Sequence, residues 1–188
     1  IFTMGARPVA SMNSLRFGSL ERARNRFLLD QVVEGIADYG NCLGIPTIGG
    51  EVVIEDCYSG NCLVNAMSVG IVDTKHVASA IAKGVGNPVF IVGSRTGKDG
   101  IHGATFSSEE MDEGSPATAV QIGDPITQKK FSDAIAKEAI EQCLYNSITD
   151  NGAGGMSCSV AEMAKECGGF VIDLEKVPLK YPGLQPWE

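Results

Sequence analysis

Apolar side chains recur along the first half of the chain at two different spacings. Three runs rich in β-branched and apolar residues have the composition of strands, at residues 8–17, 46–55 and 63–72. A polar, glycine-containing link at 57–61 separates the last two runs, which is typical of a hairpin turn. After the first run, charged residues at 19–22 open a segment with apolar positions three to five residues apart, at Phe27, Leu28, Val32, Ile36 and Tyr39. This spacing predicts a helix with one face toward a core.

The second half predicts helices separated by short strands. A short helix at 75–83 is closed by Gly84, and a strand follows at 88–92. Four-residue spacing of apolar side chains predicts a helix over 129–145. Ser159 and Glu162 have the spacing of a capping box, which predicts a helix that starts there and ends at Gly168-Gly169, before a strand at 170–174.

Strands between helices that cover one face indicate an α+β fold. The composition changes at residues 84–87, where two glycines and an asparagine follow the short helix. We therefore predict two structural units, at residues 1–84 and 85–188.

The charge balance narrows the range of partners. Fifteen Lys and Arg side chains against 23 Asp and Glu give a net charge of −8, whereas nucleic acid and anionic membranes attract clustered Lys and Arg. We expect neither as the main partner.

No apolar run approaches the roughly 18 residues of a membrane helix, and the start lacks the pattern of a signal peptide. These features favour a cytoplasmic protein.

The six cysteines and the chain ends also carry information. The cysteines form no Cys-x-x-Cys pair and have only two histidines beside them, so we expect reduced packing residues and not a zinc site or disulfides. The chain opens without an initiator Met and stops without a terminal helix or tail. These ends predict an internal fragment of a longer protein.

Two glycine-rich segments could bind a phosphate or a metal ion. Gly49-Gly50-Glu51 lies within a predicted strand, where paired glycines let a ligand approach the backbone and Glu51 could ligate Mg²⁺; a β-bulge is the alternative. Residues 93–106 follow a predicted strand, and their backbone N–H groups with Arg95 or Lys98 could cradle a phosphate. A polar hairpin loop is the other interpretation, and the order of residues is not that of a Walker A loop.

Two further segments place a polar side chain beside a turn. Gln121 comes near the end of a predicted strand that turns at Gly123-Asp124-Pro125, and its amide can both donate to and accept from a substrate. Asp150 precedes a glycine-rich helix entry, where it could hold Mg²⁺ against a phosphate. The sequence offers no activated nucleophile. Carboxylates and glycine loops without one indicate Mg²⁺-assisted phosphoryl chemistry.

Six segments, in this order, resemble the synthetase subunit of phosphoribosylformylglycinamidine synthase: residues 1–8, 39–42, 46–51, 97–106, 120–125 and 150–155. The stretch from Asp99 to Phe106 is specific to this family, whereas Gly-Gly-Glu is shared with a wider superfamily that includes aminoimidazole ribonucleotide (AIR) synthetase. The resemblance implies the C-terminal part of a PurM-like N-terminal α/β domain, followed by most of a PurM-like C-terminal α+β domain.

The resemblance also implies a reaction and its participants. ATP would phosphorylate the amide oxygen of formylglycinamide ribonucleotide, and ammonia from a separate glutaminase subunit would displace the phosphate. By motif, Gln121 would contact the ribonucleotide and Asp150 would ligate Mg²⁺. Glu51 would lie near the metal or nucleotide, and Lys98, Asp99 and His102 are further candidates for substrate binding. A small accessory subunit would complete the enzyme.

The family carries further catalytic and ATP-binding motifs before and after the matched region, so we expect the chain by itself to be inactive. Its first unit would present an unpaired sheet edge and an apolar face, which favours dimerisation. Two alternatives stay open. One is another ATP-dependent enzyme of the AIR synthetase superfamily, against which residues 97–106 argue. The other is a catalytically silent nucleotide-binding or assembly module.

Overall fold

The computed structural model describes residues 1–101, 114, 123–152, 154–185 and 187. The chain divides into two compact units, Ile1–Lys75 and His76–Glu188. Within the described residues, no helix combines the length and the apolar character that a membrane span requires.

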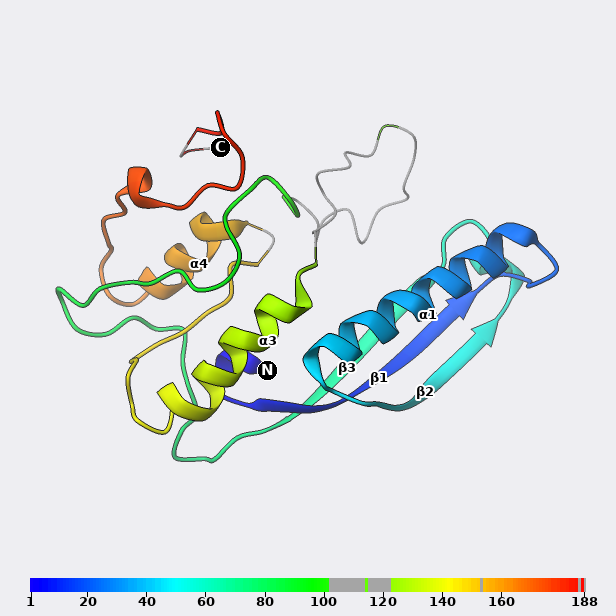
Figure 1. The fold of residues 1–188 in the computed structure, drawn as a ribbon, viewed down its shortest axis with the longest axis horizontal. Coiled ribbons are helices and arrows are strands. Elements are labelled where there is room, and N and C mark those ends of the chain that lie inside the picture. The colour runs from blue at the N-terminus through cyan, green and yellow to red at the C-terminus, as the bar shows by residue number, and fades with distance from the viewer. Residues whose placement is uncertain (102–113, 115–122, 153, 186, 188) are drawn as a thin grey trace. The chain divides into compact units, whose positions relative to one another are not determined.

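The first unit is a three-stranded sheet with one long helix (Figure 1). Strand β1 (Arg7–Phe17) is central, paired in parallel with β2 (Thr47–Ile54) and antiparallel with β3 (Leu63–Ile71). Helix α1 (Ala23–Leu43) joins β1 to β2. A parallel pair needs such a crossover, because the chain must return to the same end of the sheet before the second strand begins.

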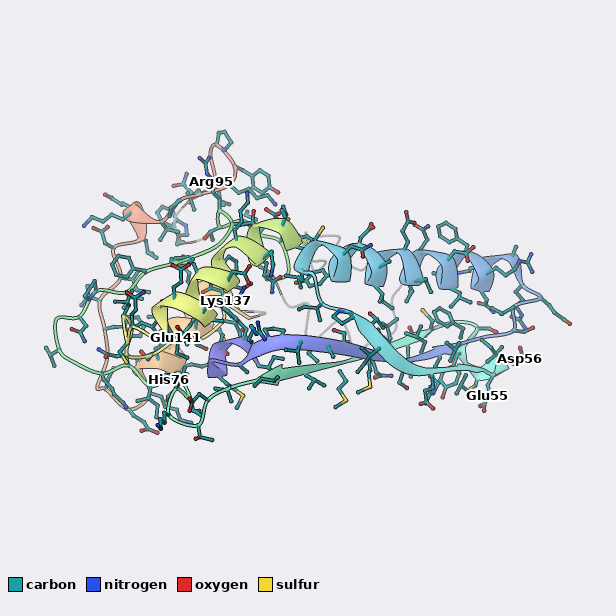
Figure 2. All side chains as sticks on the ribbon, turned by 60° about the horizontal axis from the view of Figure 1, so that its bottom comes forward. Glu55, Asp56, His76, Arg95, Lys137 and Glu141 are labelled. Carbon is teal, nitrogen blue, oxygen red and sulfur yellow. The ribbon has the colours of Figure 1, made fainter. Side chains whose placement is uncertain are left out.

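The three predicted strands exist, but the predicted hairpin is wrong. β2 and β3 lie on opposite sides of β1 and do not pair with each other. After β2 the chain stays bonded to the end of β1, where the Glu55 N–H donates to the Phe17 carbonyl (2.9 Å). A 3₁₀ turn at Asp56–Tyr58 then carries it past β1 (Figure 2). The parallel β1–β2 pair leaves the other edge of β1 open for β3, which explains why the link does not form a tight turn.

Helix α1 lies along one face of this sheet (Figure 1). On the central strand, Leu15 and Phe17 share a face and are almost fully buried, with 6% and 0% of their surface exposed. Helix side chains from Leu28 and Val32 are half-buried. Phe27, which the spacing assigned to the same face, is exposed because neighbouring residues turn about 100° around a helix axis. Gly44 ends the helix in the left-handed conformation (φ 67°).

The second unit has two main helices in its described part. Helix α3 (Pro125–Asp133) is capped by Asp124, whose carboxylate accepts a hydrogen bond from the Thr127 N–H. The helix runs on into a π-helical turn, η4 (Ala134–Ala139). The helix predicted over 129–145 is thus present but begins and ends earlier. Lys137 and Glu141 lie along this stretch and just after it (Figure 2). A 3₁₀ turn, η5 (Leu174–Lys176), lies near the end of the chain.

Helix α4 (Gly155–Ala164) begins four residues earlier than the capping box predicted. Gly154 is its N-cap. The Ser159 hydroxyl lies within the helix and donates to the Asn151 side chain, so it does not accept from a backbone N–H as a cap would. The capping-box interpretation is therefore wrong for Ser159.

Three further predictions for the second unit are wrong. Residues 75–83 form no helix, and neither 88–92 nor 170–174 is a strand. A strand needs a neighbouring backbone to accept its hydrogen bonds, and the described residues of this unit supply one bridge only, between Thr96 and Leu179. Phe90 and Val171, from the two predicted strands, are 78% and 98% exposed.

Candidate functional site

The structure describes four of the six predicted site residues. Glu51 belongs to the first unit, and Lys98, Asp99 and Asp150 belong to the second. Gln121 and His102 lie outside the described residues.

Glu51 lies in a row of polar side chains across the sheet of the first unit. The register places Ser14 of β1 opposite both Glu51 of β2 and Asn65 of β3, so the three share one face. Leu15 and Phe17 occupy the other face, which α1 covers, and the polar row therefore lies on the open face. Glu51 Oε1 accepts from the Ser14 hydroxyl (2.9 Å) and from the Arg16 guanidinium (2.5 Å).

These two bonds stabilise the ionised form of Glu51. The hydrogen bond from Arg16, and after it the one from Ser14, lower the pKa of the Glu51 carboxyl, because both favour the ionised form. Both bonds end on Oε1. A cation approaching Glu51 would therefore meet an anion already paired with Arg16. Sequence reasoning missed Arg16, although its position two residues after Ser14 on a strand would have placed it on the same face.

The Lys98-Asp99 segment is held by the C-terminal part of the chain. The backbones of Thr96 and Lys180 lie side by side: the Lys180 N–H donates to the Thr96 carbonyl (2.8 Å) and the Thr96 N–H to the Pro178 carbonyl (3.1 Å). The Lys180 ammonium donates to Asp99 Oδ2 at 2.7 Å, and this bond is the main cause that raises the pKa of Lys180. Asp99 is thus paired with a cation of its own chain. Lys180 lies 81 residues away, and no sequence signal pointed to it.

Asp150 is exposed at the entry to α4. Its Oδ1 accepts a hydrogen bond from the Gly152 N–H (2.8 Å), which closes a local turn. The residues on either side of it are bonded to α4. Thr149 Oγ1 donates to Glu162 Oε2 (3.3 Å), and Asn151 Oδ1 accepts from Ser159 Oγ (2.8 Å).

The surroundings of Asp150 fit a Mg²⁺ ion in one respect only. Mg²⁺ is commonly bound through one or two carboxylates, with water and substrate phosphates in the remaining positions. Asp150 supplies one exposed carboxylate. In the described ranges, no three His, Cys, Asp or Glu side chains gather as a full protein shell would require. Asp150 would therefore need water, phosphate or groups beyond the described residues as co-ligands.

Cys158 offers a pH-dependent reporter of this region. All six cysteines are free, and the Cys158 thiol lies 3.4 Å from Glu162 Oε1. This hydrogen bond, followed by the negative charge of Glu162, raises the pKa of Cys158 above its usual value, since both disfavour the thiolate.

We expect alkylation of Cys158 by iodoacetamide to be slower at pH 8 in the wild type than in Glu162→Ala. Without the carboxylate the pKa falls and the thiolate fraction rises; well above both pKa values the two rates should converge. Peptide-resolved mass spectrometry measures the rate at each pH, with Cys167 in the same sample as an internal reference. Equal Cys158 rates at pH 8 would contradict the assigned contact.

Comparison with known proteins defines the class to which this fold and these motifs belong. The sequence model of AIR synthase related protein, N-terminal domain, matches residues 1–72, and that of the C-terminal domain matches residues 84–188. The chain belongs to the AIR synthase related family. It contains part of the PurM-like N-terminal domain and most of the PurM-like C-terminal domain, with an α+β architecture.

Within this family the chain is similar to one particular enzyme subunit. It is 53% identical over 196 residues to phosphoribosylformylglycinamidine synthase subunit PurL of Chlorobium luteolum, a match over 100% of this chain and 26% of that protein. The chain thus spans about a quarter of the length of this curated relative.

Solved structures of PurL from Thermotoga maritima agree with this similarity. The PurL chain complexed with FGAR is 37% identical, with a TM-score of 0.83 over 99% of this chain and 30% of that one. The PurL chain complexed with ATP is 34% identical, with a TM-score of 0.75 over 98% and 27%. The chain from PurLQS is also 34% identical, with a TM-score of 0.76 over 100% and 28%.

Proposed function

We propose that this chain is part of an ATP-dependent ligase of purine biosynthesis, which converts formylglycinamide ribonucleotide to the amidine with ATP and glutamine-derived ammonia. The observation that carries the proposal is 53% identity to PurL across the whole chain. The T. maritima PurL structures with FGAR and with ATP support the two substrates.

We assign substrate-binding and metal-binding roles to different residues of this chain. Gln121 would bind the ribonucleotide, with Lys98, Asp99 and His102 as neighbours. Asp150 would hold Mg²⁺, which supplies positive charge against the phosphates of ATP. Glu51, already paired with Arg16, would stand near the metal or nucleotide. Residues 1–84 and 85–188 would form the two domains that carry these groups.

The same proposal covers partners and assembly. The PurLQS structure supports a complex with other subunits, which we take to be a glutaminase and a small accessory protein. The chain by itself would be inactive, and its open sheet face would favour pairing with a second copy. Large apolar side chains are exposed on that face, among them Met67 at 56%.

The decisive experiment compares the wild type with Asp150→Asn in the full-length protein that carries this chain. We expect ADP release with formylglycinamide ribonucleotide, ATP, Mg²⁺ and ammonium in the wild type, and a loss of about a hundredfold or more in the variant, because the amide removes the charge that holds the metal. Asp30→Asn makes the same change at an exposed position of α1 and should leave the rate unchanged.

Two results would count against the proposal. ADP release that does not depend on formylglycinamide ribonucleotide would favour another enzyme of the superfamily. A folded wild type that binds ADP tightly without turnover would favour the silent module.

A further inference from the structure

We propose that Ser159 and Glu162 of α4 are positioning residues for Asp150, acting through the two residues that flank it. This inference rests on the metal role proposed for Asp150. Ser159 and Glu162 are three residues apart, so they lie on one side of the helix. From that side, Ser159 bonds Asn151 and Glu162 bonds Thr149. The segment from 149 to 151 is therefore tied to α4 before and after Asp150.

The two bonds differ in their surroundings. Ser159 is 5% exposed, and its hydroxyl donates to Asn151 Oδ1 at 2.8 Å, with the Met156 carbonyl as a second acceptor at 3.3 Å. Without Asn151, this buried hydroxyl would keep only the longer contact to the Met156 carbonyl, so breaking the Asn151 bond exchanges a short hydrogen bond for a weaker one. Glu162 is exposed and accepts from both Thr149 Oγ1 and Cys158 Sγ, one on each carboxylate oxygen. It links the segment before Asp150 to the first turn of α4.

Backbone hydrogen bonds from residues 79–82 add a further link between the segment before Asp150 and helix α4. The Ile148 N–H donates to the Ser79 carbonyl (3.0 Å), and the Ala82 N–H donates to the Met163 carbonyl of α4 (3.0 Å). Residues 79–82 thus connect the segment that leads to Asp150 with the helix that holds its neighbours. The backbone of Asp150 is restrained on both sides.

The restraint leaves the Asp150 carboxylate itself in solvent. Oδ1 is oriented by the Gly152 N–H (2.8 Å), and the side chain is exposed at the start of the helix. A carboxylate whose backbone is already fixed loses less conformational freedom when it binds a cation than one on a loose loop. The contribution of Ser159 and Glu162 is therefore expected in metal affinity and not in the chemical step.

The test uses full-length protein carrying Ser159→Ala or Glu162→Ala, each alone and combined with Asp150→Asn. Mn²⁺ serves as the probe, and electron paramagnetic resonance measures its binding to the resting enzyme. We expect each substitution to weaken the Asp150-dependent Mn²⁺ binding about fivefold, the effect of one lost hydrogen bond. The Mg²⁺ concentration for half-maximal ADP release should rise by the same factor, with kcat at saturating Mg²⁺ within about twofold of the wild type.

Coupling to Asp150 separates positioning from general damage. In the Asp150→Asn background, Ser159→Ala and Glu162→Ala should change Mn²⁺ binding no further, because the ligand that they position is gone. Glu166→Ala, an exposed glutamate two residues beyond the end of α4, is the matched control and should bind Mn²⁺ like the wild type. If Ser159→Ala fails to fold, Glu162→Ala carries the test alone, since its side chain is exposed.

Two results overturn the inference in distinguishable ways. Wild-type Mn²⁺ affinity in both variants, with Asp150→Asn still inactive, would refute positioning and leave the proposed function intact. An Asp150→Asn protein with normal Mn²⁺ binding and ADP release would refute the metal role, and the positioning role with it.

Discussion

Gly50→Ala is expected to destabilise the first unit by about 3 kcal/mol or more, which is a large share of the stability of a small domain. A β-carbon built on Gly50 would lie 1.9 Å from the carbonyl oxygen of Asn13 on the neighbouring strand. The obstacle is backbone, which cannot rotate away as a side chain can. Gly50 also has φ of 144°, a conformation that is essentially restricted to glycine. Both effects act where β2 pairs with β1, so these two strands must separate or shift.

Gly49 provides the matched control for this prediction. A β-carbon there would meet nothing within 4 Å, and its φ is not positive. Hydrogen–deuterium exchange in the full-length protein should show faster exchange of the β1 and β2 amides in Gly50→Ala, and near-normal exchange in Gly49→Ala. Equal protection in the two variants would contradict the described pairing.

Strand positions in the first unit could be predicted from the sequence because the signal is local. The run that became β1 alternates between the covered and the open face, and the run that became β2 has the β-branched residues that strands favour. Their order could not be predicted in the same way. The link between β2 and β3 has the composition of a hairpin turn, but the sheet places β1 between them. That outcome depends on α1 carrying the chain back to make a parallel pair, which no local pattern encodes.

In the candidate site, too, local sequence patterns predicted some features, whereas contacts between distant residues could not be predicted. Asp150 and Glu51 stood out because a carboxylate beside glycines is a local pattern. The residues that bond to the candidate site residues could not be found in this way. Lys180, for example, bonds to Asp99 but lies 81 positions away in the sequence. Ser159 was misinterpreted because its spacing to Glu162 fits a capping box as well as it fits two contacts from one side of a helix.

Gly18→Ala is expected to disrupt the best-buried corner of the first unit, where β1 ends and α1 begins. A β-carbon on Gly18 would lie 2.1 Å from Ser59 Oγ, 2.5 Å from Ser59 Cα and 2.6 Å from Asn25 Nδ2. Asn25 is 1% exposed, and its amide donates to the Ser19 carbonyl (2.9 Å) and to Ser59 Oγ (3.3 Å). Displacing Ser59 therefore adds the cost of a weakened buried hydrogen bond to the cost of overpacking. Together these amount to about 3 kcal/mol.

Two variants distinguish this local clash from a general intolerance of substitution. Gly60→Ala, next to Ser59, would meet nothing within 4 Å and should unfold like the wild type. Adding Ser59→Gly to Gly18→Ala should recover part of the lost stability, because it removes the hydroxyl at 2.1 Å but leaves the Cα at 2.5 Å in place. Thermal unfolding and hydrogen exchange at the start of α1 measure the effect. A Gly18→Ala protein with wild-type protection there would mean that Ser59 and Asn25 are not packed against Gly18.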